Sequence, residues 1–116
     1  MFGRIKIRRS DKLFREYLLK LRGEISAFSG KRGKVQVSHF HGRRHENTRF
    51  DEENCDLLTF SEHQYFEENP AAYQEWKLKQ LGEKKYKELM VRANTYKKRD
   101  DKLQEIILKK LVEKTN

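Results

Sequence analysis

The stretch VSHFHGRRH, residues 37–45, gives the clearest indication of the fold and holds three of the four histidines of the chain. Apolar and polar residues alternate from Val35 to His39, and this two-residue period predicts a β-strand. A polar, arginine-rich loop follows, and then the mostly apolar segment 55–60, which predicts the return strand. The stretch is therefore expected to begin a β-hairpin.

A short helix is expected to follow the hairpin. Ser61 and Gln64 have the spacing of a capping box, so the helix should begin there and carry His63, the fourth histidine. Pro70 suits the first turn of a further helix, and Gly82 suits its end. Residues 34–68 should thus form a strand–strand–helix core.

Helices are also predicted on both sides of this core. Residues 1–9 are expected to be a basic arm, and Ser10 and Asp11 should cap a helix over 10–23 that ends at Gly23. Residues 70–115 should hold about three helices, the last one capped by Asp100 and Asp101. Their apolar stripes are typical of a core or of a seam with a partner helix: Tyr73, Trp76, Leu78, Leu81; Tyr86, Leu89, Met90, Ala93; Leu103, Ile106, Ile107, Leu111. We predict one α+β domain over residues 1–116.

Composition limits the classes of function. The chain has 116 residues, of which 35% are hydrophobic and 39% are charged, so it has room for only a modest core. No apolar run could span a bilayer and the amino terminus does not resemble a signal peptide, so we expect a cytoplasmic protein without membrane contact. The lone Cys55 cannot form an internal disulfide or a structural zinc site. Any metal must be held by histidine and oxygen.

The net charge of +9 is unevenly distributed. Residues 1–50 carry a net +10, residues 51–70 a net −7, and residues 71–116 a net +6. Basic flanks suit a polyanion such as DNA, although lysine-rich helices can also simply be soluble. An acidic segment between them is harder to reconcile with a phosphate backbone unless a cation lies between the two.

The order His39, Asn54, His63 along the chain indicates an enzyme that hydrolyses phosphodiester bonds. His39 ends a strand and His63 begins a helix, so the hairpin could bring both imidazoles into one cleft. Hydrolysis needs a base for water, a cation to stabilise developing charge and a group that orients the base. We assign these roles to His39, to a divalent ion on His63, and to Asn54. Singly, each residue is more often structural: a histidine bonded to a carbonyl, a surface histidine, a turn former.

Further site residues are less sharply defined. Among His41, His45, Asp51 and Asp56, His41 is the preferred second metal ligand, because it shares a strand face with His39. For phosphate contacts we select a group of arginines that could also be solvated loop residues: Arg43, Arg44, Arg49. Cys55 is expected to be a buried apolar residue, and Tyr73 and Trp76 to be core rather than stacking platforms for bases.

The chain also resembles phage recombination proteins of the NinG/Rap type, which are HNH, or ββα-metal, nucleases. The resemblance runs from about residue 11 to 94 and is dense in three stretches: SHFHGRRH (38–45), TRFDEENC (48–55), HQYFEENP (63–70). It implies a phage or prophage metal-dependent endonuclease acting on duplex or branched DNA, with Mg²⁺ or Mn²⁺, or alternatively Zn²⁺ or Ni²⁺. It also implies that His39 is the general base, Asn54 the hairpin asparagine and His63 a metal ligand.

Two departures from this family pattern affect the prediction. The cysteines that bind a structural zinc in the family match four other residues here: Ser26, Ser29, Thr59, Glu62. No structural zinc is therefore expected, and packing should replace it through these side chains: Phe28, Leu57, Leu58, Phe60, Tyr65. Ser38 stands where HNH nucleases commonly have a carboxylate, so a second metal ligand must come from elsewhere.

Two alternative functions and the oligomeric state stay open at this point. A catalytically inactive DNA-binding or packaging-accessory protein of the same fold would keep the basic flanks but need no divalent ion. An RNA-binding module is less favoured, because no recognition motif of the usual RNA-binding folds is present. A homodimer through the carboxy-terminal helices would be a way to address both DNA strands.

Overall fold

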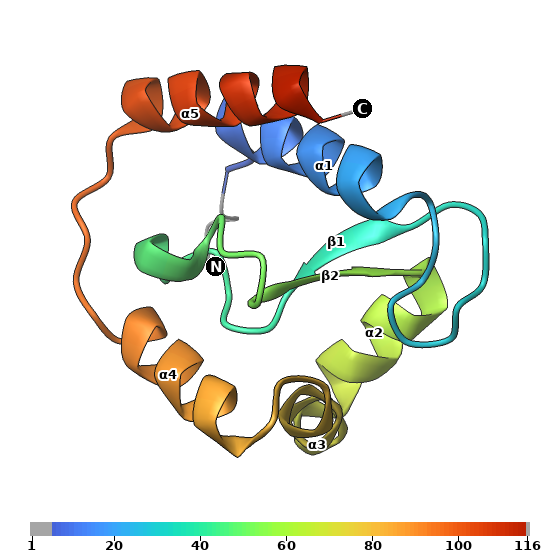
Figure 1. Cartoon of the computed structure of the whole chain (residues 1–116). Coiled ribbons are helices and arrows are strands. Elements are labelled where there is room, and N and C mark those ends of the chain that lie inside the picture. The colour runs from blue at the N-terminus through green and yellow to red at the C-terminus, as the bar shows by residue number, and fades with distance from the viewer. Residues whose placement is uncertain (1–5, 116) are drawn as a thin grey trace. The chain divides into compact units, whose positions relative to one another are not determined.

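The computed structural model describes residues 6–115 (Figure 1). It consists of an N-terminal helix, a two-stranded antiparallel hairpin and then four helices, which confirms the predicted α+β class. Contacts divide the chain into two compact units, residues 24–97 and residues 1–23 with 98–116. All the motif residues lie in unit 24–97. No helix within residues 6–115 has the length and apolarity that a membrane span requires.

The hairpin pairs β1 (Gln36–His39) with β2 (Cys55–Leu58), and the loop between them contains the 3₁₀ helix η1 (Glu46–Thr48). In the register, His39 lies opposite Cys55 and Ser38 opposite Asp56. All four residues of β2 are buried, so this strand lies in the interior of the unit. It ends at Leu58, two residues before the predicted end.

Helix α2 (Phe60–Glu68) begins earlier than predicted, and a different capping box starts it. Thr59 Oγ1 accepts from the Glu62 backbone N–H (3.2 Å), and a Glu62 carboxylate oxygen accepts from the Thr59 backbone N–H (2.9 Å). The box predicted at Ser61 and Gln64 is therefore wrong. Because β2 ends at Leu58, the extended residue that precedes the helix is Thr59.

Helices α3 (Pro70–Leu81) and α4 (Glu83–Ala93) follow as predicted, with Pro70 in the first turn of α3. Gly82 separates them with φ +84°, a left-handed conformation that favours glycine. The ring of Phe66 on α2 stacks on Tyr73 and Trp76 of α3, with centroids 4.5 and 5.5 Å apart. This aromatic cluster packs on Leu58 and is the core beside the hairpin, as expected for Tyr73 and Trp76.

A buried charged network fastens α3 to the hairpin. The Lys77 ammonium donates to an Asp56 carboxylate oxygen (2.9 Å), and Gln80 donates to the other oxygen (2.9 Å). Burial, and then the charge of Asp56, raise the pKa of Tyr73, so this phenol keeps its proton and donates it to Asp56 (3.2 Å). The Ser38 hydroxyl can therefore donate to the Tyr73 oxygen (2.9 Å). Ser38 thus connects β1 to this network.

In the other unit, α1 (Arg9–Arg22) packs against α5 (Asp101–Lys114). The cap predicted for α1 is wrong: Asp11 accepts from the Arg8 backbone N–H (2.8 Å), so Ser10 and Asp11 lie inside the helix. Asp100 caps α5 as predicted by accepting from the Leu103 N–H (3.1 Å). Of the predicted basic arm, residues 1–5 lie outside the described residues, and residues 6–8 have no regular structure.

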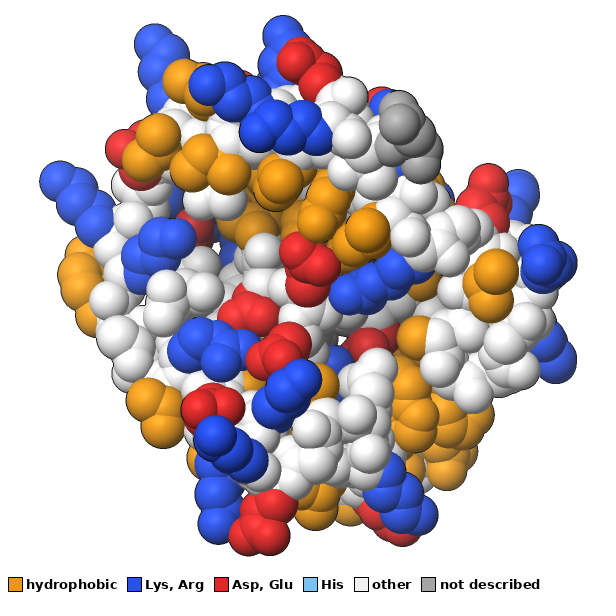
Figure 2. All heavy atoms as spheres, in the orientation of Figure 1, with side chains coloured by type: hydrophobic (Ala, Val, Ile, Leu, Met, Phe, Trp, Pro, Cys, Tyr) orange, Lys and Arg blue, Asp and Glu red, His pale blue; other side chains and the backbone are white. Residues whose placement is uncertain are grey.

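The apolar stripe predicted for α5 is not its buried face. Leu108 and Val112 are buried, whereas Leu103 and Ile106 are each 53% exposed. Figure 2 shows both hydrophobic and Lys or Arg side chains over α5 at the top of the view. On α4, Leu89 and Ala93 are buried as expected, but Met90 of the predicted stripe is exposed.

Candidate functional site

Three of the predicted imidazoles line one cavity of about 440 Å³. His39 and His41 enter it from the end of β1 and the residues after it, and His63 enters it from the first turn of α2. The aromatic residues Phe66 and Tyr73 form part of its wall, and Tyr86 and Met90 of α4 line it as well. The hairpin and the helix therefore bring His39 and His63 to the same cavity.

The ring of His39 is held by a backbone carbonyl. Its Nε2 lies 2.9 Å from the carbonyl oxygen of Arg49. A carbonyl oxygen can only accept, so Nε2 carries a proton, and in the neutral form of the ring the lone pair lies on Nδ1. The carbonyl bond is the one expected of a structural histidine, but it also fixes the tautomer that a general base at Nδ1 needs.

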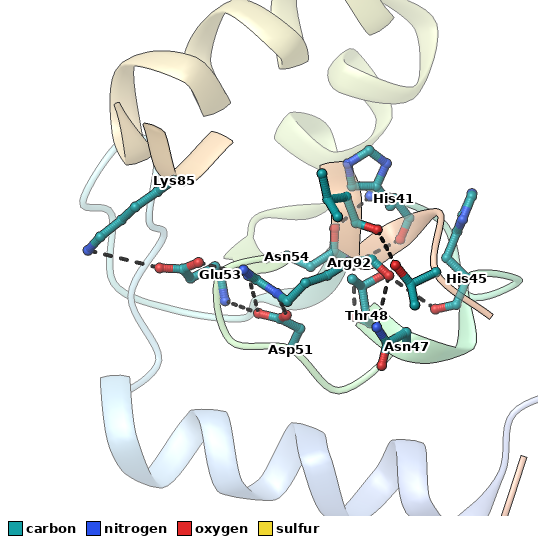
Figure 3. A network of polar contacts seen from close by, with 11 residues as sticks. His41, His45, Asn47, Thr48, Asp51, Glu53, Asn54, Lys85 and Arg92 are labelled. Carbon is teal, nitrogen blue, oxygen red and sulfur yellow. Dashed lines mark hydrogen bonds and ion pairs between the residues drawn. The ribbon is translucent and has the colours of Figure 1, made fainter. Parts of the chain in front are cut away.

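Asn54 is fully buried and holds the loop rather than the ring of His39 (Figure 3). Its side-chain oxygen accepts from the His41 N–H (2.7 Å), and its amide nitrogen donates to the carbonyl oxygens of His41 (2.8 Å) and Thr48 (3.0 Å). The group that orients His39 is the Arg49 carbonyl. Asn54 braces both ends of the loop that presents this carbonyl, so its orienting role is indirect.

His63 has two polar neighbours that the sequence analysis did not select. Its Nδ1 lies 2.8 Å from the Gln36 side-chain oxygen on β1, and its Nε2 lies 3.4 Å from a carboxylate oxygen of Glu67. Glu67 lines the same cavity. The signal that could have identified it is the spacing of four residues between His63 and Glu67, which places both side chains on one face of α2.

The other proposed metal ligands differ in their availability. His41 lines the cavity, and burial, then the nearby His45, then Lys77 lower its pKa, which favours the neutral ring that binds metals. By contrast, His45 Nδ1 donates to the Ala93 carbonyl (2.8 Å) and Asp51 is paired with Arg92 (2.8 Å). Asp56 is buried against Lys77. His41 is therefore the best placed of the four candidates.

The described residues offer only a small set of possible protein ligands for a metal ion in this cavity. Among residues 6–115, no three His, Cys, Asp or Glu side chains are grouped closely enough to hold one ion. His63 and Glu67 are close neighbours, and His41 lines the same space. Ions such as Mg²⁺ keep several waters and take remaining ligands from substrate phosphate, so a small protein ligand set is compatible with them.

The three predicted phosphate-binding arginines occupy different environments. Arg49 is only 2% exposed, and its guanidinium donates to the Arg43 carbonyl (3.2 Å). The charged group bonds within the loop it belongs to, and this burial disfavours the phosphate contact predicted for Arg49. Arg43 is partly buried, whereas Arg44 is exposed and remains available for such a contact.

Helix α4 is attached to the same loop by polar contacts (Figure 3). Arg92 donates to carboxylate oxygens of Asp51 and Glu53, both at 2.8 Å, and hydrogen bonds to both acids raise its pKa although burial opposes this. Asn47 donates to the Arg92 carbonyl (3.0 Å). Two acids of the acidic segment thus have a structural partner, so they do not by themselves indicate a cation site.

The four positions that match the zinc cysteines of the resembled family come together as a hydrogen-bonded cluster. The Ser26 hydroxyl donates to a Glu62 carboxylate oxygen (2.6 Å) and accepts from the Ser29 N–H (3.0 Å), while Thr59 and Glu62 form the capping box of α2. The burial expected of the side chains that should replace the zinc is found for only two of the five. Leu57 and Leu58 are buried, but three aromatic residues are largely exposed: Phe28, Phe60, Tyr65.

Cys55 is fully buried in β2, with its sulfur 3.7 Å from the Arg49 carbonyl oxygen, as expected for an inert residue.

In the comparisons with known proteins, no family model, curated protein or solved structure matches the chain.

Proposed function

We propose that this chain is a metal-dependent endonuclease of the HNH type that hydrolyses phosphodiester bonds in DNA. The observation that carries the proposal is the cavity shared by His39, His41 and His63, in which the Arg49 carbonyl fixes the tautomer of His39. The sequence resemblance and the basic character of the chain support the same substrate class.

In this proposal His39 Nδ1 takes a proton from a water molecule in the cavity. The water oxygen attacks phosphorus, the bond to the leaving oxygen breaks, and that oxygen takes a proton from solvent. The Arg49 carbonyl stabilises the imidazolium that forms, because Nε2–H continues to donate to it. Asn54 keeps this carbonyl in place by holding Thr48 and His41.

His63 and Glu67 would hold the divalent ion, with waters and substrate phosphate as its remaining ligands, and the ion would neutralise charge that develops on the phosphate. The predicted ligand His41 lines the same cavity but is not grouped with these two side chains closely enough to share one ion with them in this structure. Gln36 orients His63 by accepting from Nδ1–H, which leaves Nε2 as the ligand atom on the side of Glu67.

The proposal is tested by nicking of supercoiled plasmid and of a four-way junction with Mg²⁺ or Mn²⁺. We expect His39→Ala to reduce the rate by about 10²- to 10⁴-fold, the range for loss of a general base. His63→Ala should also reduce the rate, because it removes a ligand of the divalent ion. Gln64→Ala, exposed on the same helix, is the matched control and should keep full activity. Thermal unfolding of each variant establishes that the fold is kept.

Equal inactivity of wild type and His39→Ala on every substrate and ion would refute the nuclease. The second candidate is then a non-cleaving DNA-binding protein. The observation that favours it is that His39 and His63 already have hydrogen-bond partners within the protein, as structural histidines do. Its signature would be DNA binding that persists unchanged in chelator.

A further inference from the structure

A second cavity, of about 340 Å³, lies where α4 ends. Its lining includes the exposed cations Arg44 and Lys97, the aromatic ring of Tyr96 and one acid, Glu46. Tyr96 is 87% exposed, more than any other large hydrophobic side chain of residues 6–115. A ring so exposed contributes little to folding, because it removes almost no apolar surface from water.

Part of the lining of this cavity comes from the end of α4 and the two residues that follow it. The Thr95 hydroxyl donates to the Val91 carbonyl (2.7 Å), and Asn94 donates to the Met90 carbonyl (2.8 Å). From the loop side, His45 donates to the Ala93 carbonyl (2.8 Å). These bonds close the helix end and fix the backbone from which Tyr96 and Lys97 extend.

This second cavity lies next to the first. The rings of His41, in the first cavity, and His45, in the second, have centroids 5.7 Å apart. Met90 of α4 lines the first cavity. Ala93 at the end of the same helix and the following Asn94 line the second, about one helical turn of 5.4 Å further on. The two cavities are therefore close enough for neighbouring nucleotides of one strand to occupy them.

We propose that the second cavity binds an unpaired nucleotide beside the scissile phosphate, with its base stacked on Tyr96 and its phosphate near Arg44 and Lys97. Only an unpaired base presents a free ring face, since a base inside a duplex is stacked on both sides. The inference rests on the proposed nuclease function and adds a substrate class: DNA with single-stranded nucleotides at the cleavage position.

Binding without cleavage tests this site directly. The anisotropy of a short fluorescein-labelled oligonucleotide is measured in chelator, as a single strand and as the matching duplex. Stacking on an aromatic side chain corresponds to an affinity loss of about five-fold or more on alanine substitution. We therefore expect Tyr96→Ala to weaken single-strand binding by at least that factor and duplex binding by less than about two-fold. Tyr96→Phe should bind as wild type, because it keeps the ring.

Tyr65→Ala is the matched control, since Tyr65 is an exposed tyrosine on α2 that lines neither cavity. Unchanged single-strand affinity in Tyr96→Ala, or an equal loss for both forms of DNA, would overturn the site. Because chelator prevents cleavage, the result is independent of the nicking assay. An inactive protein that still shows the Tyr96 effect would refute the nuclease and keep the nucleotide site.

Discussion

At the scale of single residues, Glu62 shows how one carboxylate can connect two segments of the chain through its hydrogen bonds. Burial alone would raise its pKa, but hydrogen bonds from Ser26, Ser29 and Thr59 outweigh burial and lower it below the ordinary value of 4.5. The ionised carboxylate therefore joins the segment before β1 to the start of α2.

Glu62→Gln should lower the free energy of unfolding at pH 7, because an amide accepts weaker hydrogen bonds than a carboxylate. The folded pKa is depressed, so this stabilisation is complete above pH 4.5 and is lost as the pH falls through the folded pKa. Urea unfolding from pH 7 to pH 3 should show the wild-type and variant curves converging. Glu68→Gln, exposed on the same helix, is the control, and a gap that stays constant with pH would contradict the mechanism.

At the scale of elements, Lys77 and Asp56 determine how α3 sits on the hairpin. Both side chains are buried, at 1% and 2% exposure, so removing one partner leaves an uncompensated charge. We expect Lys77→Met to cost about 3–5 kcal/mol of unfolding free energy, and Lys77→Met with Asp56→Leu to recover part of it. Lys79→Met, which breaks an exposed pair with Glu75 on the same helix, should cost less than about 1 kcal/mol. Chemical denaturation measures the unfolding free energy of all three variants. Equal decreases for Lys77→Met and Lys79→Met would show that the buried ion pair does not hold α3 to the hairpin.

The order of elements could be predicted from the sequence because each has a local signal, such as Pro70 before α3 and Gly82 after it. Local signals fail where two patterns compete. Thr59 with Glu62 and Ser61 with Gln64 have the same spacing, and only the burial of Leu58 at the end of β2 selects the first. In α5 the exposed Leu103 and the buried Leu108 are equally apolar, so the face that meets α1 cannot be identified from α5 alone.

The candidate site was predictable in its histidines but not in the groups that orient them. His39 and His63 follow from their order in the chain. The Arg49 carbonyl does not, because backbone atoms carry no sequence signal and the bond spans ten residues of irregular loop. The burial of Arg49 depends on the same loop conformation, which neither hydrophobic periodicity nor secondary-structure propensity predicts.

At the scale of the whole molecule, the net charge belongs almost entirely to one of the two units. Residues 1–23 with 98–116 carry fourteen Lys or Arg against six Asp or Glu, a net +8, whereas residues 24–97 carry thirteen against twelve, a net +1. The unit with the candidate site is thus close to neutral. If the chain binds DNA, α1 and α5 should supply most of the counterion release that drives binding.

This partition predicts which cations set the salt dependence of DNA binding. The affinity is measured in chelator over a range of salt concentration, and the slope of log Kd against log salt counts phosphates neutralised, at about 0.9 per contact on a duplex. One variant changes exposed lysines of α1 and α5 to glutamine: Lys12, Lys102, Lys109, Lys110. The matched control changes exposed cations of the other unit: Lys31, Arg32, Lys34, Lys84. We expect the first variant to reduce the slope by one or more contacts and the control to leave it nearly unchanged, although both lose four positive charges. Equal slopes in the two variants would mean that total charge, and not the helix pair, determines the attraction.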